Sequence, residues 1–513
     1  MTTTDRLARP WARLKALSSS ASPAHVVFIA SLLLSLIAIS ASPTLNRDGM
    51  LYVEAARAFL NEGFLAARAV FNWPFLPILM AVVSRATGLG PETSGYLLNA
   101  LFMAGACSLM VSCAGRNFPE AVWPTCLVVL ALPGLNHYRD EILREYGCWF
   151  FFMLSFWIAL RWSEMPRWKT VLAAQVALAL AALFRPEALA FFPALTVWQL
   201  SAAPKGERKL RILMTVALPV LGLAVLLSLF YFGQFGPEHR LAGEIGRFNV
   251  AGFDAKARTL SSALIPYAQD QARIILFFGS IAIIPLNFLR HIGIFLVPLL
   301  FVFSRGSLRN AVVRWQPFSW AFLLHLFVLV IFVLDVQFLA GRYVAVLCLL
   351  AAPLIGYGLW LLMQRFPRWN SLAIALSVLI MVSNVVSLSP GKRHFVEAGT
   401  WLAQNATDSP RIYSGSPSAA YYAGWGTVST RGAVEERVHL PERLAQGQYD
   451  LVVLEVSHRE PDITSWLSSI GLHEIRRFSD AKRDAVVVAE PLGKNQDSAS
   501  KTERKRENTG SIE

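Results

Sequence analysis

The sequence predicts a mainly α-helical bundle that crosses a membrane many times and carries a small α/β domain near its C-terminal end. Of its 513 residues, 55% are hydrophobic and only 16% are charged, whereas roughly a quarter of the residues in a soluble protein are charged. Apolar runs about as long as a bilayer-spanning helix recur from Ala24 to beyond Leu372. After residue 388 the pattern changes to short strands that alternate with helices, which is typical of an α/β domain.

The net charge of +13 does not indicate a nucleic-acid-binding protein, because the basic residues gather in short runs between the apolar segments. Such runs are typical of the ends of membrane helices. The five cysteines all fall in apolar stretches. They therefore predict neither a disulfide framework nor a cysteine-based metal site.

The apolar runs predict about eleven transmembrane spans, and the first begins at Ala24. The polar stretch after it contains apolar residues at helical spacing from Met50 to Phe59, which predicts an amphipathic helix on the membrane surface. The other runs begin near Ser94, Val122, Tyr146, Thr170, Glu187, Ile212, Ile292, Pro317, Val344 and Leu372.

Basic residues between the runs predict the orientation of the bundle. Four basic loops, at residues 161–169, 205–211, 305–314 and 365–368, fall on the same side of one threading of the chain. This side is cytoplasmic by the positive-inside rule. We therefore expect a multi-pass protein of the plasma (inner) membrane, with a cytoplasmic N-terminus and an extracytoplasmic C-terminal domain.

The predicted domain boundaries are 1–388 for the transmembrane domain, 389–493 for the extracytoplasmic α/β domain and 494–513 for a disordered tail. In the α/β domain, strands are expected at RIYSG, YDLVVLEV and DAVVVAE, and helices at WLAQNA and ITSWLSSIGL. The tail is polar and has few hydrophobic residues, a composition typical of disordered chains.

Asp48 lies just after the first span, in the segment NRDGMLYVEAARAFL, near the start of the predicted amphipathic helix. Aspartate is one of the residues that commonly cap a helix, which is a purely structural role. The alternative role is chemical. Asp48 would then be a general base, or a carboxylate paired with a divalent ion, that faces an acceptor at the membrane surface.

A second polar cluster, HYRDEILREYG, separates two apolar runs. A solvated loop with local ion pairs is the ordinary explanation of such a segment. The loop is short, however, and membrane segments flank it, so its carboxylates are expected on the same surface as Asp48. Asp140, Glu141 and Glu145 are the candidates for a second acidic contact to a metal ion or an acceptor.

Isolated arginines lie at the ends of two apolar runs, in LFRPEALAFFP and LAGRYVAVL. A guanidinium group binds phosphate oxygens in a fork and remains charged at any relevant pH. Snorkelling toward the membrane interface explains Arg185 equally well. Arg342 beside Tyr343, at an outer helix end, is better placed to bind a lipid phosphate.

Together these segments resemble the GT-C membrane glycosyltransferases. The nearest branch is that of the protein O-mannosyltransferases and the lipid A aminoarabinose transferase, that is, glycosyltransferase family 39 and its bacterial relatives. NRDGMLYVEAARAFLNEG is similar to their first-loop segment, and HYRDEILREYGCWFFF is similar to their second-loop segment. LFRPEALAFFPAL and GRYVAVLCLLAAPL look like two further recurring segments. The resemblance covers about Pro43 to Leu362.

The resemblance implies transfer of a sugar from a polyprenyl-phosphate carrier to an acceptor on the outer face of the membrane. It assigns the base or acceptor contact to Asp48, the second acid to Asp140, Glu141 or Glu145, and the phosphate clamp to Arg342 with Tyr343. Arg185 would assist that clamp.

A divalent metal ion held by Asp48 and Asp140 would be consistent with the resemblance. Relatives often place an acid before the proline that opens the next apolar segment, and this chain has Asn72-Trp73-Pro74 there. This departure weakens the expectation of metal dependence. The expected partners are the lipid-linked sugar, membrane lipid and an acceptor that is lipid A, another glycan or a protein.

Two other functions fit the same composition. A transporter or flippase for a lipid-linked sugar would share the spans and basic pockets, but its ionisable residues should lie near the bilayer midplane. A polymerase or ligase for O-antigen-type chains would use the same lipid-linked donor. The position of the acidic residues at helix ends favours an enzyme.

Overall fold

The computed structural model describes residues 22–231, 250–304, 306, 308–386, 392–406, 411–426, 430–460 and 463–492. It divides the chain into two compact units. The first unit comprises Met1–Ala41 and Asn72–Val386, and the second comprises Ser42–Phe71 and Ser387–Glu513. The predicted tail, residues 494–513, lies outside the described residues.

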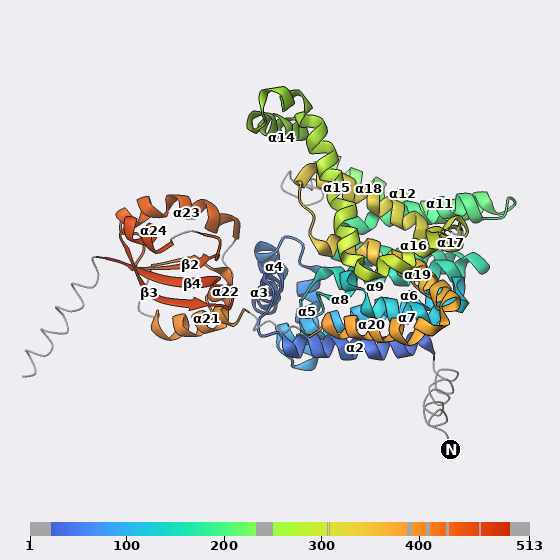
Figure 1. Cartoon of the computed structure of the whole chain (residues 1–513), viewed down its shortest axis with the longest axis horizontal. Helices are drawn as coiled ribbons and strands as arrows, with labels where there is room; N and C mark the ends of the chain where they lie inside the picture. The colour runs from blue at the N-terminus through green and yellow to red at the C-terminus, as the bar shows by residue number, and fades with distance from the viewer. Residues whose placement is uncertain are drawn as a thin grey trace, which may run out of the picture. The chain divides into compact units, whose positions relative to one another are not determined.

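The regular elements of the first unit, among its described residues, are all helices (Figure 1). Its α-helices are α2 (Pro23–Ala41), α5 (Phe75–Thr87), α6 (Pro91–Asn117), α7 (Val122–Ala131), α8 (Pro133–Asn136), α9 (Arg144–Glu164), α10 (Trp168–Phe184), α11 (Phe192–Ala202), α12 (Arg208–Tyr231), α14 (Val250–Ala263), α15 (Ala272–Ile292), α16 (Leu296–Ser304), α17 (Leu308–Arg314), α18 (Phe318–Val336), α19 (Gly341–Arg365) and α20 (Asn370–Ser383). Short 3₁₀ turns are η1 (Pro119–Ala121), η2 (Pro186–Phe191), η3 (Pro266–Gln271), η4 (Gly293–Phe295) and η5 (Pro367–Trp369).

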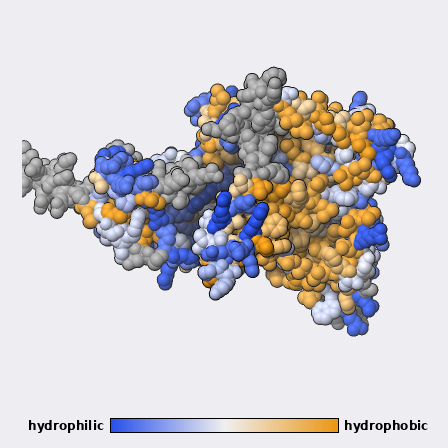
Figure 2. All heavy atoms as spheres, turned by 90° about the horizontal axis from the view of Figure 1, so that it is seen from above, coloured by the Kyte–Doolittle hydropathy of each residue, from blue (hydrophilic) through white to orange (hydrophobic). Residues whose placement is uncertain are grey.

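The length of its apolar helices and its hydrophobic surface indicate that this unit is a multi-pass membrane bundle. Among the described residues, five helical segments are long and apolar enough to cross a bilayer, namely Pro23–Ala41, Pro91–Asn117, Pro266–Ser304, Phe318–Val336 and Gly341–Arg365. The second and the last of these are mostly buried and form the centre, whereas only 28%, 17% and 22% of the apolar window is buried in the other three. Figure 2 shows hydrophobic residues spread over the surface of these helices. An apolar surface this extensive belongs in lipid.

The second unit is an α/β structure in which a four-stranded sheet has helices on both faces (Figure 1). Its elements are α3 (Arg47–Glu62), α4 (Phe64–Val70), α21 (Arg393–Asn405), β1 (Ile412–Gly415), α22 (Pro417–Tyr422), α23 (Thr430–Ala445), β2 (Leu451–Val456), α24 (Ile463–Ser469), β3 (Leu472–Ser479) and β4 (Ala485–Pro491).

The sheet runs in the order β1-β2-β4-β3, with β1 and β2 parallel and the other pairs antiparallel. Side chains of β2 alternate between its two faces. Val452 and Leu454 pack toward Leu440 of α23 and Leu467 of α24. Val453, on the other face, packs in the cluster that contains Phe395, Ala398 and Leu402 of α21. This alternation with burial on both faces explains why β2 has an almost continuous hydrophobic sequence.

The polar stretch after the first span folds into α3 and α4 and belongs to the second unit. The backbone N–H of Leu45 donates a hydrogen bond to the Tyr422 hydroxyl at 2.8 Å. Arg47 forms an ion pair with Glu455 at 2.5 Å, and the Arg57 guanidinium lies 5.7 Å from the centre of the Tyr421 ring. The expected helix from Met50 is therefore present, and the loop and the α/β domain form one compact unit.

Candidate active site

The ends of three helices of the first unit bring four of the predicted site residues together. Glu145 lies in the first turn of α9, Arg185 caps the C-terminal end of α10, and Arg342 and Tyr343 open α19. Gly147 allows α9 and α10 to approach closely, because a Cβ atom at this position would collide with the Phe184 ring. Small residues are the usual means of close helix packing in membrane proteins.

Glu145 is the buried acid of this cluster, with 3% of its surface exposed. It accepts a hydrogen bond from Nη1 of Arg185, and its Oε1 lies 3.5 Å from Nε of Arg342. Arg185 also donates from Nη2 to Oε1 of Glu187 at 2.7 Å. Each carboxylate is thereby matched to a guanidinium group, which is the condition under which buried charges are tolerated.

Tyr343 provides the aromatic wall of the cluster. The Arg185 guanidinium lies 4.6 Å from the centre of its ring, and that of Arg342 lies 5.7 Å away. Distances of this size allow attraction between a cation and the ring face. His325, in mid-helix on α18, is within 3.1 Å of the Tyr343 carbonyl oxygen through Nε2. It acts as a buried packing residue behind the cluster.

The two arginines differ in access. The Arg185 side chain is 11% exposed and is held by two glutamates, whereas the Arg342 side chain is 27% exposed. Arg342 is therefore the guanidinium that a ligand can reach from outside the protein, and Arg185 fixes the carboxylate beside it.

Arg139, which was not among the predicted site residues, anchors the HYRDEILRE segment. Arg139 is buried and donates hydrogen bonds to Asn136 Oδ1, to the Ser31 carbonyl oxygen and to the Ser35 hydroxyl, each at 2.8 Å. These bonds tie the turn to α2. Asp140 and Glu141, by contrast, lie half-buried on the turn. Of the three candidate acids, Glu145 is the one that the structure joins to the two arginines.

Asp48 lies in the second unit, in the first turn of α3. The helix begins at Arg47 with Asn46 at its N-cap position, so Asp48 is not the capping residue. Its side chain is half-buried. The helix dipole favours an acid in the first turn, which explains why this position tolerates a carboxylate. A chemical role of Asp48 is compatible with this position.

Two further residues of this region, Glu187 and Gly341, were not predicted from the sequence. Glu187 follows Arg185 by two positions in RPE, a spacing that could have indicated the ion pair. Gly341 packs so closely against His291 and the Tyr138 hydroxyl that any Cβ atom there would collide with them. Nothing in the local sequence indicates that contact, because it joins segments 50 and more than 200 residues apart.

A divalent metal ion would need a set of ligands. The described residues contain no group of three or more His, Cys, Asp or Glu side chains arranged to hold an ion. Glu145 is also already engaged by two guanidinium groups. We therefore derive no step through a metal ion.

Solved structures resemble the chain along nearly its whole length. The crystal structure of ArnT from Cupriavidus metallidurans bound to undecaprenyl phosphate superimposes with a TM-score of 0.56, at 14% sequence identity, over 90% of this chain and 97% of ArnT. This chain has the fold of ArnT. The apo structure of the same protein gives a TM-score of 0.42 at 15% identity, over 91% of this chain and 98% of the other.

ArnT is the lipid A aminoarabinose transferase and has the GT-C fold. The resemblance predicted from the loop segments is thus confirmed at the level of the fold, as are the polytopic helical bundle and the small C-terminal sheet. No family model matches the sequence. No curated protein sequence matches it either.

Proposed function

We propose that this protein is a glycosyltransferase that moves a sugar from a polyprenyl-phosphate-linked donor to an acceptor on the extracytoplasmic face of the membrane. The acceptor is lipid A, another glycan or a protein. The observation that carries the proposal is the buried cluster of Glu145, Arg185 and Arg342, in a fold shared with a protein crystallised with undecaprenyl phosphate.

The charges of the cluster suit a phosphate. Three guanidinium groups, those of Arg144, Arg185 and Arg342, act on two carboxylates, those of Glu145 and Glu187. Of these arginines, Arg342 is the one that a ligand can reach, because its side chain is 27% exposed. A lipid phosphate that binds there gains charge-assisted hydrogen bonds, which are roughly twice as strong as neutral ones.

The proposed chemistry needs few groups. An acceptor hydroxyl oxygen attacks the anomeric carbon of the sugar, and the bond from that carbon to the phosphate oxygen breaks. The polyprenyl phosphate leaves with the bonding electrons, and Arg342 stabilises the negative charge that it gains. Asp48 takes the proton of the acceptor hydroxyl as general base.

The same geometry favours an enzyme over a transporter. The cluster gathers at the ends of α9, α10 and α19. Transporters place their substrate sites at broken helices near the bilayer midplane, and Arg185 and Arg342 lie outside the interiors of their helices.

Purified protein and undecaprenyl phosphate provide the test. Arg342→Ala should weaken binding of this lipid by roughly 10- to 100-fold, because hydrogen bonds to charged groups contribute about 1.5–3 kcal/mol. Arg342→Lys should restore part of the affinity, since lysine keeps the charge and loses the fork. Arg365→Ala is the matched control, because Arg365 is exposed in the last turn of the same helix. Unchanged binding by Arg342→Ala would remove the phosphate clamp from the proposal.

A further inference from the structure

A cavity with a volume of about 530 Å³ lies within the α/β unit. Gly415 and Pro417 border it where β1 ends, and Val456 and Ser457 border it where β2 ends. Ligands of open α/β sheets bind beyond the carboxyl ends of parallel strands, and β1 and β2 are the parallel pair of this sheet. Cavities of roughly 300–1,000 Å³ are the usual size for small-molecule sites.

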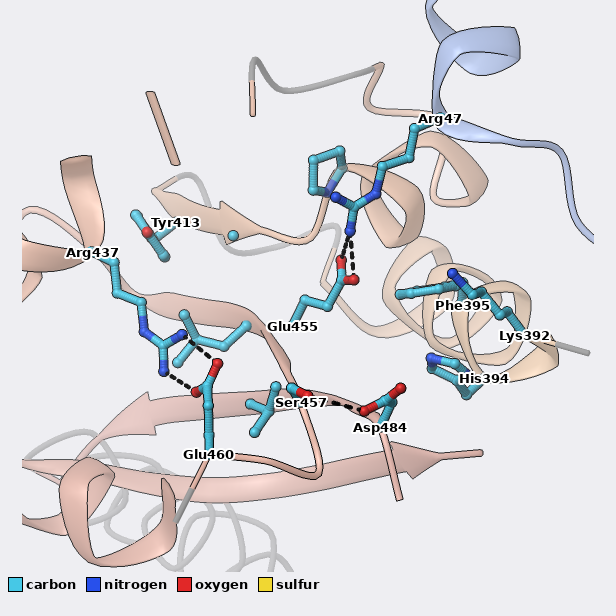
Figure 3. A pocket seen from close by; sticks show the side chains of 14 residues that line it. Arg47, Lys392, His394, Phe395, Tyr413, Arg437, Glu455, Ser457, Glu460 and Asp484 are labelled. Carbon is cyan, nitrogen blue, oxygen red and sulfur yellow. Dashed lines mark hydrogen bonds and ion pairs between the residues drawn. The ribbon is translucent and has the colours of Figure 1, made fainter. Parts of the chain in front are cut away.

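The charges around this cavity balance. Three cationic side chains line it, those of Arg47, Lys392 and Arg437, and so do three carboxylates, those of Glu455, Glu460 and Asp484. Both Glu455 oxygens lie 2.5 Å from Nη2 of Arg47. Arg437 donates to Glu460 at 2.8 Å. Figure 3 shows both ion pairs among the side chains that line the cavity.

This balance selects the class of ligand. A phosphate would be repelled by the three carboxylates, and a cation would be repelled by the three cationic side chains. A neutral molecule with many hydroxyl groups avoids both conflicts, because each hydroxyl donates to a carboxylate and accepts from a guanidinium N–H. Carbohydrates are the common molecules of this kind.

His394 adds an independent observation. It lines the cavity and is 3% exposed, and neither ring nitrogen has a hydrogen-bond partner among the described residues. Burial lowers the pKa of His394, so the ring is neutral at neutral pH and offers one donor and one acceptor. A hydroxyl group matches both. Buried polar groups without partners are rare and indicate a missing ligand or water.

We propose that this cavity binds neutral sugar residues of the acceptor. The assignment of the ligand as part of the acceptor rests on the proposed transferase function. Arg47 lines the cavity, and the next residue in α3 is Asp48, the proposed base. A glycan held by Arg47 and Glu455 would therefore be recognised on the same unit that carries the base.

The test is binding of the purified full-length protein to an array of neutral, amino and phosphorylated oligosaccharides. The wild type should bind neutral glycans in preference to their phosphorylated forms. Glu455→Gln and Glu460→Gln should each reduce neutral-glycan binding by about 10-fold or more, as expected for the loss of a hydrogen bond to a charged group. The Glu460 side chain is 39% exposed, so its variant tests the cavity with little risk to folding.

Glu474→Gln is the matched control. Glu474 forms an ion pair of the same kind, at 2.6 Å to Arg477 on β3, and neither residue lines the cavity. Its variant should bind glycans as the wild type does. Absence of glycan binding by the wild type, preference for phosphorylated glycans, or competition by inorganic phosphate would each overturn the proposal. Binding to the array is independent of transfer, so this proposal and the transferase function can fail separately.

Discussion

At the scale of single residues, Glu145 differs from the other two acids of its segment by its surroundings. It is buried between Arg185 and Arg342, whereas Asp140 and Glu141 are half-buried on the preceding turn. The sequence could not choose among the three. Their order along the chain is visible, but the helix ends that approach Glu145 come from residues 40 and almost 200 positions away.

We predict that Glu145→Gln destabilises the protein by about 3 kcal/mol and abolishes sugar transfer. The amide keeps the shape of the side chain but removes the negative charge between Arg185 and Arg342, so that Arg185 keeps Glu187 alone as its counter-charge. Breaking a buried pair typically costs about 3–5 kcal/mol. Asp140→Asn and Glu141→Gln should change stability by less than about 1 kcal/mol and reduce transfer only mildly. Thermal unfolding in detergent and a transfer assay measure both effects. A stable, active Glu145→Gln variant would show that another acid of the segment is the functional one.

At the scale of secondary structure, the sequence predicted the elements whose hydrophobic pattern is strong. The segments RIYSG, YDLVVLEV and DAVVVAE are strands, as expected, and ITSWLSSIGL contains a helix. The prediction missed β3, because this edge strand contains LHEIRRFS and most of its residues are exposed. Charged side chains are typical of edge strands, where they discourage pairing with other chains, and they also conceal the strand from pattern analysis.

Helix α19 provides a prediction at this scale. Gly341→Ala should lower transfer activity at least tenfold, although alanine favours a helix by up to about 1 kcal/mol over glycine. The added methyl group collides with the His291 ring and the Tyr138 hydroxyl, and we expect the first turn of α19, which carries Arg342, to shift in response. Misplacing a substrate contact by about 1 Å can cost about 100-fold in rate.

Gly279→Ala on α15 is the control for that substitution, since Gly279 is exposed and, within the described part of the chain, nothing outside its own helix backbone lies within 4 Å of the added Cβ atom. Both variants should be compared for membrane accumulation and for transfer. Equal activity of the two variants would mean that the position of Arg342 does not depend on the Gly341 contact.

At the scale of the whole molecule, the structure groups the first loop with the C-terminal residues. The sequence predicted a transmembrane domain from 1 to 388, whereas Ser42–Phe71 belongs to the compact unit of the α/β sheet. The contacts responsible, such as Leu45 with Tyr422 and Arg47 with Glu455, join residues 377 and 408 positions apart. No local pattern encodes them.

The proposed topology has a direct test. Since the basic loops belong on the cytoplasmic side, a fluorescent reporter that matures only in the cytoplasm should be dark when fused after Leu492. The same reporter inserted in the loop at residues 205–211 should be bright. A bright fusion after Leu492 would place the α/β unit in the cytoplasm and exclude transfer on the outer face.

In the proposed reaction, Asp48 is the general base of sugar transfer. Asn46 rather than Asp48 holds the N-cap position of α3, so Asp48→Asn keeps the capping residue. The charge that it removes interacts with the helix dipole, and such an interaction contributes about 0.3–1 kcal/mol. The fold should therefore survive. Loss of a general base reduces rates by a factor of about 10² to 10⁴.

The most direct measurement is mass spectrometry of envelope glycolipids and glycoproteins from cells that lack the protein, complemented with the wild type or with Asp48→Asn. We predict that deletion removes one sugar from a defined envelope component and that the wild type restores it. The Asp48→Asn variant should be present in the membrane but should not restore the sugar. An envelope profile unchanged by deletion, or full restoration by Asp48→Asn, would contradict it.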